Sequence, residues 1–104
     1  MITIDLDNNT ERKFNQLLNA MGMKYDALID SMLNYRIQEL KTGINAIEKD
    51  FIKYESKYNL SSKLFYKKYM NGEFEDKSDN TDFLIWSGEY ESYQEFIKEL
   101  DKLR

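Results

Sequence analysis

The sequence contains no cysteine, histidine or proline among its 104 residues, and only 4 glycines. The absence of cysteine and histidine excludes disulfides, thiolate or imidazole zinc sites, and the Cys and His side chains that many enzymes use as nucleophile or base. Without proline and with few glycines, long helices are permitted and turns are few. The composition therefore favours a mainly helical protein that is not an enzyme and holds no cofactor.

Long hydrophobic runs are also absent. No apolar run approaches the ~20 residues of a membrane span, and the N-terminus lacks a basic region followed by an apolar one. We therefore expect a cytoplasmic protein without a membrane partner.

Charge is unevenly distributed along the chain, although the net charge is only -4. Residues 1–72 carry 11 Lys or Arg against 9 Asp or Glu, whereas residues 73–104 carry 4 against 10. An acidic end repels nucleic acid and suits a basic partner. A chain of this length also buries only a modest core unless it oligomerises.

One stretch near the N-terminus, Ile-Thr-Ile-Asp-Leu at residues 2–6, alternates apolar and polar residues as a half-buried β-strand does. No other stretch shows this pattern. Because a lone strand leaves the hydrogen-bonding groups of both edges unpaired, a second copy would have to supply its partner. The expected fold is mainly α: a homodimer around an intermolecular two-stranded antiparallel ribbon, with a long second helix and a C-terminal helical tail.

Helical periodicity and capping residues predict the remaining elements. A short first helix runs from about Thr10 to Met21 and stops at Gly22. A second begins near Tyr25 or Asp26 and continues for about 33 residues, or roughly 50 Å. A short third helix follows a Ser cap near residue 62, and a last one runs from residue 81 or 82 to the C-terminus, after an acidic loop at residues 73–82.

Two apolar stripes follow these helices, with successive residues three or four apart. The stripe of the second helix, over residues 33–58, packs either on a copy of itself in a dimer or on a different protein. The stripe of the last helix is rich in aromatic residues, which occur in cores and also anchor interfaces. Its members are Phe83, Trp86, Tyr90, Tyr93, Phe96, Ile97, Leu100 and Leu103.

Residues 2–36 resemble the ribbon-helix-helix family, in which a strand, a short helix, a Gly turn and a second helix follow one another. Ile2, Ile4 and Leu6 stand where the strand of that family has its core residues. The matching helix and turn positions are Phe14, Leu17, Gly22, Leu28, Ile29, Met32 and Leu33. The family includes the Arc and Met repressors, whose paired strands lie in the DNA major groove.

The resemblance implies where operator DNA would bind. The outward strand positions Thr3 and Asp5 would face the base edges, and the backbone N–H groups near Lys24 and Tyr25 would hold a phosphate. Asp5 departs from the family, in which this position is commonly basic. A carboxylate here would repel the DNA phosphates.

The C-terminal half is similar to the tail of small prokaryotic antitoxins of type II toxin-antitoxin pairs. The similar segments are residues 57–62, 65–66, 71–74, 82–83 and 86. This resemblance implies that residues 1–45 form a dimeric head that represses its own operon, while residues 46–104 bind and mask a basic protein toxin. As an antitoxin, the chain would bind its partner through Phe74, Phe83, Trp86 and Tyr90, which would stay incompletely buried without it.

Other functions stay open beside the antitoxin. One is a DNA-binding regulator without a toxin partner, and another is a structural dimerisation protein of phage or plasmid origin. The paired carboxylates Glu73 and Glu75, or Asp79 and Asp82, are of the type that binds a divalent cation or acts as acid and base. Because they lie in an expected loop where nothing fixes them, a solvated acidic surface is the better interpretation.

Overall fold

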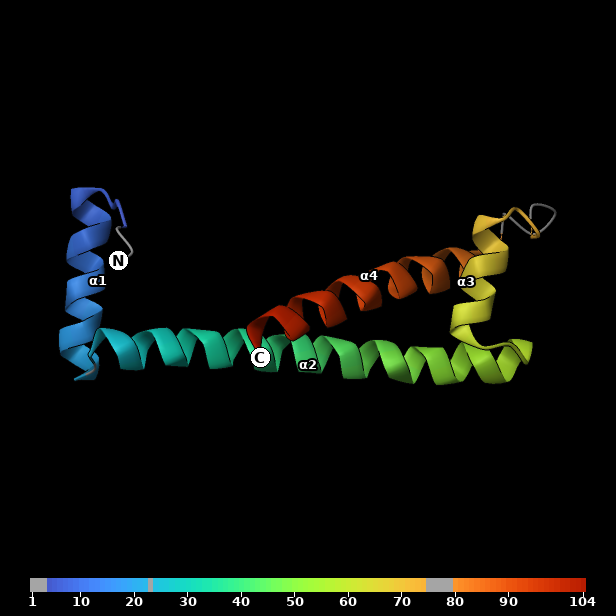
Figure 1. Cartoon of the computed structure of the whole chain (residues 1–104), viewed down its shortest axis with the longest axis horizontal. Coiled ribbons are helices and arrows are strands. Elements are labelled where there is room, and N and C mark those ends of the chain that lie inside the picture. The colour runs from blue at the N-terminus through green and yellow to red at the C-terminus, as the bar shows by residue number, and fades with distance from the viewer. Residues whose placement is uncertain (1–3, 23, 75–79) are drawn as a thin grey trace. The chain divides into compact units, whose positions relative to one another are not determined.

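The structure is a computed structural model that describes residues 4–22, 24–74 and 80–104. Its helices are α1 (Asn8–Met21), α2 (Tyr25–Tyr58), α3 (Ser62–Met70) and α4 (Thr81–Leu103) (Figure 1). Packing divides the chain into unit 1 (Met1–Arg36) and unit 2 (Ile37–Arg104), earlier than the expected functional division after residue 45. No helix in the described ranges is long and apolar enough to cross a membrane.

The prediction of a mainly α chain with a long second helix is confirmed, but the predicted strand is wrong. Ile4 to Asp7 belong to no strand or helix, and the side chains of Ile4 and Leu6 are exposed. A strand persists only where a neighbour pairs with its backbone N–H and C=O groups, and no described segment does so. The predicted intermolecular ribbon, and with it the ribbon-helix-helix fold, is therefore wrong, and the described chain consists of four helices. Ile2 and Thr3 lie outside the described residues.

Capping residues fix the ends of α1. The carboxylate of Asp7 accepts a hydrogen bond from the backbone N–H of Thr10 at 2.6 Å, and this bond lowers the pKa of Asp7. Asp7 is the N-cap of this helix, which therefore begins at Asn8, two residues before the expected start near Thr10. At the other end Gly22 adopts φ 62°, a left-handed conformation that glycine enters without steric cost.

Unit 1 has little core of its own. Among the residues of this unit that the structure describes, the buried apolar side chains are Leu18 on α1 and Leu28 on α2. The ring of Phe14 stacks on that of Tyr25 with centroids 5.7 Å apart, and the Tyr25 hydroxyl donates to Asn15 at 3.4 Å.

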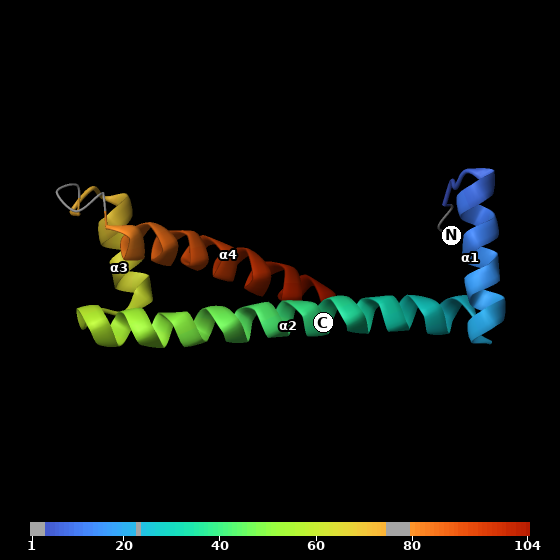
Figure 2. The ribbon, with the colours of Figure 1, turned by 180° about the vertical axis from the view of Figure 1, so that it is seen from behind.

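Unit 2 is a long hairpin in which α4 runs back along the C-terminal part of α2, while α3 closes the far end (Figures 1 and 2). Near the end of α2, Tyr58 packs edge-on against Phe83, and at the opposite end of α4 Leu100 packs with Leu40 and Ile44. The main core contains Ile47, Phe51, Tyr54, Phe65, Phe83 and Trp86. The apolar stripes predicted for α2 and α4 therefore cover each other within unit 2.

Gly43 on α2 permits close approach of α4. A Cβ at this position would lie 2.9 Å from Cε2 of Phe96, which is closer than carbon atoms pack without a shift. Gly88 on α4, by contrast, has open space where its Cβ would lie. The two helical glycines therefore have different effects. Gly43 makes room for the Phe96 ring, whereas Gly88 makes room for no neighbour and only weakens its helix.

We expect Gly88→Ala to raise the free energy of unfolding by roughly 0.5–1 kcal/mol, because alanine loses less backbone entropy in a helix. Gly43→Ala should lower it by about 1 kcal/mol or more, because the Phe96 ring must move. Urea unfolding of both variants measures the difference, and stabilisation by both substitutions would contradict the packing of Phe96 on Gly43.

Candidate functional site

The centre of unit 2 is a stack of two aromatic rings. Phe65 of α3 and Trp86 of α4 lie 3.9 Å apart between ring centroids with an interplanar angle of 4°, and both are fully buried. The indole Nε1–H donates to the hydroxyl of Ser62 at 2.8 Å, which satisfies the one polar group of the ring. Ser62 in turn donates its backbone N–H to the Glu55 carboxylate at 2.7 Å.

The four residues predicted to bind a partner lie in or around this stack and differ in how deeply they are buried. Phe83 and Trp86 are buried, with 4% and 0% of their surfaces exposed, whereas Phe74 and Tyr90 are half-buried. Phe74 packs on Phe83 with ring centroids 5.1 Å apart. The structure therefore brings the four residues together around one core, and it leaves Phe83 and Trp86 no surface to offer to a partner.

The residues predicted to contact DNA lie in unit 1. Thr3 lies outside the described residues, and Asp5 and Lys24 are exposed. Tyr25 is exposed too, but its ring and hydroxyl already contact Phe14 and Asn15. The described chain lacks the paired strands that would insert into the DNA major groove. DNA binding therefore stays a prediction that no described element supports.

Asp82, one of the carboxylates weighed for catalysis, has a structural role. One oxygen of Asp82 accepts hydrogen bonds from Lys57 at 2.6 Å and from the Tyr58 hydroxyl at 2.7 Å. The bond to Lys57 lowers the pKa of Asp82 and raises that of Lys57. Glu73 is exposed, Glu75 and Asp79 lie outside the described residues, and the described residues contain no group of three or more acidic side chains placed to hold a metal.

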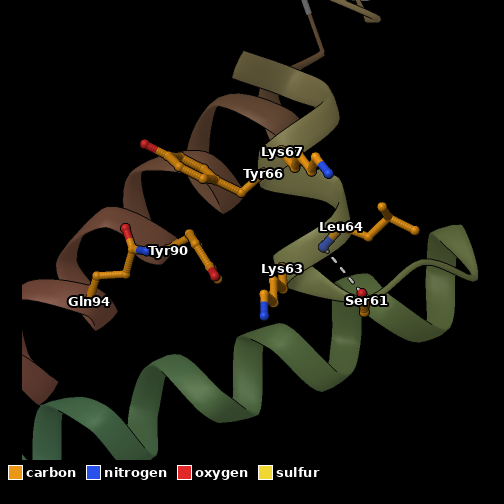
Figure 3. Close-up of a pocket in the computed structure, with 7 residues that line it drawn as sticks. All are labelled: Ser61, Lys63, Leu64, Tyr66, Lys67, Tyr90 and Gln94. Atoms are coloured by element: carbon orange, nitrogen blue, oxygen red, sulfur yellow. Dashed lines mark hydrogen bonds between the residues drawn. The ribbon is translucent and has the colours of Figure 1, made fainter. Parts of the chain in front are cut away.

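A hollow of about 390 Å³ opens between α3 and α4 (Figure 3). The ring centroids of Tyr66 from α3 and Tyr90 from α4 lie 4.7 Å apart beside it, and the Tyr66 hydroxyl donates to Glu91 at 2.9 Å. Its lining is Ser61, Lys63, Leu64, Tyr66, Lys67, Tyr90 and Gln94. No pattern in the sequence predicts this hollow, because two lysines one turn apart are typical of any solvated helix face.

The outer face of α4, opposite its aromatic stripe, combines exposed apolar and acidic residues. Leu84 lies on this face and is 64% exposed, and Gly88 one turn further along has open space where its Cβ would lie. Ile85, which is 44% exposed, lies next to Leu84 at the border between this face and the stripe. Glu91 and Glu95 follow on the same face by helical spacing and line a second hollow of about 270 Å³ with Gln94 and Lys98. Sequence reasoning missed this face, although Leu84 and Ile85 are apolar residues that fall outside the aromatic stripe.

Comparison of the chain with family models, with curated proteins and with solved structures finds no match in any of the three. Its function is therefore inferred from its own burial, charge and packing.

A pair of carboxyl groups lies between α2 and α4. Glu89 Oε2 is buried and accepts no hydrogen bond from the described residues. Burial, followed by hydrogen bonding and repulsion with Asp50, raises the pKa of Glu89 from 4.5 to about 7, while Lys53 opposes the shift. A proton shared by the two carboxyl groups would satisfy both, so the pair favours the protonated form of Glu89.

Because the pKa of Glu89 is raised in the folded chain, its contribution to stability is present below pH 4.5 and is lost as pH rises through about 7. Glu89→Gln, which mimics the protonated acid, should remove this loss and make the variant more stable than the parent above pH 7. Urea unfolding across this range checks the change, with exposed Glu95→Gln on the same helix as control. An unaltered pH profile in Glu89→Gln would contradict the shared proton.

Ser62→Ala should lower the free energy of unfolding by about 1–3 kcal/mol, because it leaves the buried indole N–H of Trp86 without an acceptor. Ser87→Ala is the matched control, since Ser87 is also buried but donates only to the Leu84 carbonyl of its own helix. Thermal unfolding of the two variants measures the difference. Equal effects would show that the indole bond adds nothing to stability.

Proposed function

We propose that this chain is a cytoplasmic protein-binding protein of the antitoxin type, which holds a basic partner protein against the outer face of α4. The observation that carries the proposal is the exposure of Leu84 and Ile85 beside Gly88, on a helix whose aromatic stripe packs against α2 and α3. The glycine leaves the helix backbone accessible at this point, so that a partner side chain can approach closely. The exposed leucine and isoleucine supply the apolar centre of an interface.

Charge identifies the kind of partner. Residues 73–104 carry 10 Asp or Glu against 4 Lys or Arg, and Glu91 and Glu95 lie next to the apolar residues on the same face. A basic protein would be attracted to this end of the chain and oriented on it, because complementary charges steer association and fix register. The antitoxin resemblance of residues 57–86 points to a toxin as that partner.

The buried aromatic cluster supports this surface rather than forming it. Phe65, Phe83 and Trp86 fix α3 against α4, so the outer face is displayed by a helix with a packed inner side. Binding to a preformed helix face costs less conformational entropy than folding on binding. The partner-binding residues are therefore proposed to be Leu84, Ile85, Glu91 and Glu95, in place of the buried Phe83 and Trp86.

The test uses the protein encoded by the reading frame adjacent to this one in the native genome, expressed with and without the chain. The neighbour should arrest growth alone, and co-expression should restore growth and give a complex that co-elutes. Leu84→Lys should weaken that complex by at least about tenfold, because it adds a like charge and removes the apolar centre. Ile52→Lys is the matched control, since Ile52 on α2 is also 64% exposed.

Two results would contradict the proposal. A neighbour that is harmless when expressed alone would remove the antitoxin role. If the Leu84→Lys and Ile52→Lys variants bound the neighbour with equal affinity, the binding surface would lie elsewhere on the chain.

A further inference from the structure

The helix α3 is basic, although the segment that follows it is acidic. It carries Lys63, Lys67 and Lys68 and no Asp or Glu, whereas residues 73–104 carry 10 acidic residues against 4 basic ones. Lys63 and Lys67 lie one turn apart, line the hollow of about 390 Å³ and are exposed. In the described part of the chain no carboxylate pairs with either ammonium group. The α3 side of the hollow is therefore positive, and its charge is not neutralised.

Aromatic rings form another part of the same lining. Tyr66 and Tyr90 pack together with an interplanar angle of 32°, and both are half-buried. The hydrogen bond from the Tyr66 hydroxyl to Glu91 fixes one of these rings. Figure 3 shows Tyr90 and Gln94 on α4 across the hollow from Lys63 on α3. The two rings thus give the hollow an apolar wall against which another flat ring can pack.

We infer that this hollow binds a mononucleotide, a ligand that joins a flat base to a phosphate. The base would pack on the tyrosine pair, because every base has a flat face that stacks on aromatic side chains. The phosphate would pair with Lys63 and Lys67, since ammonium groups bind phosphate as point charges. Gln94 would meet the edge of the base, because its amide both donates and accepts hydrogen bonds.

Both halves of such a ligand match the lining. A simple anion would use the two lysines and leave the tyrosine wall open to water, whereas an uncharged ring would leave the lysines without a counter-charge. The volume of about 390 Å³ falls within the range of roughly 300–1,000 Å³ that is typical of small-ligand sites. Such sites combine an aromatic or apolar wall with a few convergent polar groups, and this lining contains both.

The surroundings of the hollow favour a single nucleotide over a nucleic-acid strand. Gln94 lines this hollow and also the second one, whose lining includes Glu91 and Glu95. A strand that continued along α4 would bring its next phosphates toward these two carboxylates, and like charges repel. A mononucleotide has no further phosphate to place there. The inference does not depend on the binding face proposed on α4.

The test titrates the full chain at low salt with AMP, GMP, CMP and UMP and follows amide resonances by NMR. At least one nucleotide should bind saturably, with a Kd of about 1 mM or lower, and should shift the side-chain amide of Gln94. Inorganic phosphate and the matching nucleoside should each bind at least about tenfold more weakly, because each uses only part of the lining. A single-stranded tetranucleotide should bind no more tightly than the mononucleotide.

Two pairs of variants test the residues. Lys67→Gln should weaken nucleotide binding by about fivefold or more, whereas Lys68→Gln, one residue further and outside the lining, should change it by less than about twofold. Tyr66→Leu, which removes a stacking ring, should weaken binding by about tenfold, and Tyr66→Phe, which keeps the ring, should retain it. The fluorescence of Trp86, the single tryptophan, reports whether unit 2 stays folded in each variant.

The absence of saturable binding by all four nucleotides at millimolar concentration would overturn the inference. Inorganic phosphate that bound as tightly as the nucleotide would overturn it too, since the hollow would then be an anion site only. Tighter binding of the tetranucleotide would identify a strand as the ligand and contradict the mononucleotide. Equal binding by Lys67→Gln and Lys68→Gln, with unchanged Trp86 emission, would place the site outside this hollow.

Discussion

The stacking of Phe65 on Trp86 is the contact on which unit 2 depends. It joins α3 to α4, and the indole bond to Ser62 ties the same ring to the first turn of α3. Tyr54, Tyr58 and Phe83 pack around the pair and connect it to α2. Because the only tryptophan is buried in this core, the proposed binding surface lies on the opposite face of α4.

The two units differ in how they bury their apolar residues. In unit 2 the stripes of α2 and α4 cover each other, and what stays exposed is a small group that includes Leu84 and Ile85. In unit 1 the stripes of α1 and early α2 stay largely uncovered. Unit 1 thus exposes apolar side chains in a nearly neutral segment, whereas the C-terminal end of unit 2 is acidic.

Much of the fold could be predicted from the sequence, and the failures have physical causes. Periodicity located the helices, Gly22 ended α1, and the absence of proline allowed α2 to reach Tyr58. The alternation of apolar and polar residues around Ile4 and Leu6 suggested a strand. Such an alternation shows which side chains would share a face, but it does not show that a partner strand exists. The aromatic stripe of α4 marked the core correctly, whereas its role as a binding surface was inferred from composition alone, which cannot distinguish a buried ring from an exposed one.

The central claim, that Trp86 is a closed structural core rather than a binding surface, is tested most directly by hydrogen exchange of its indole N–H. A single tryptophan gives a single indole resonance, so the measurement needs no assignment. The account predicts exchange only through opening of unit 2, far slower than for a solvent-exposed indole, since the proton is buried and bound to Ser62. Exchange as fast as that of a free indole would contradict it.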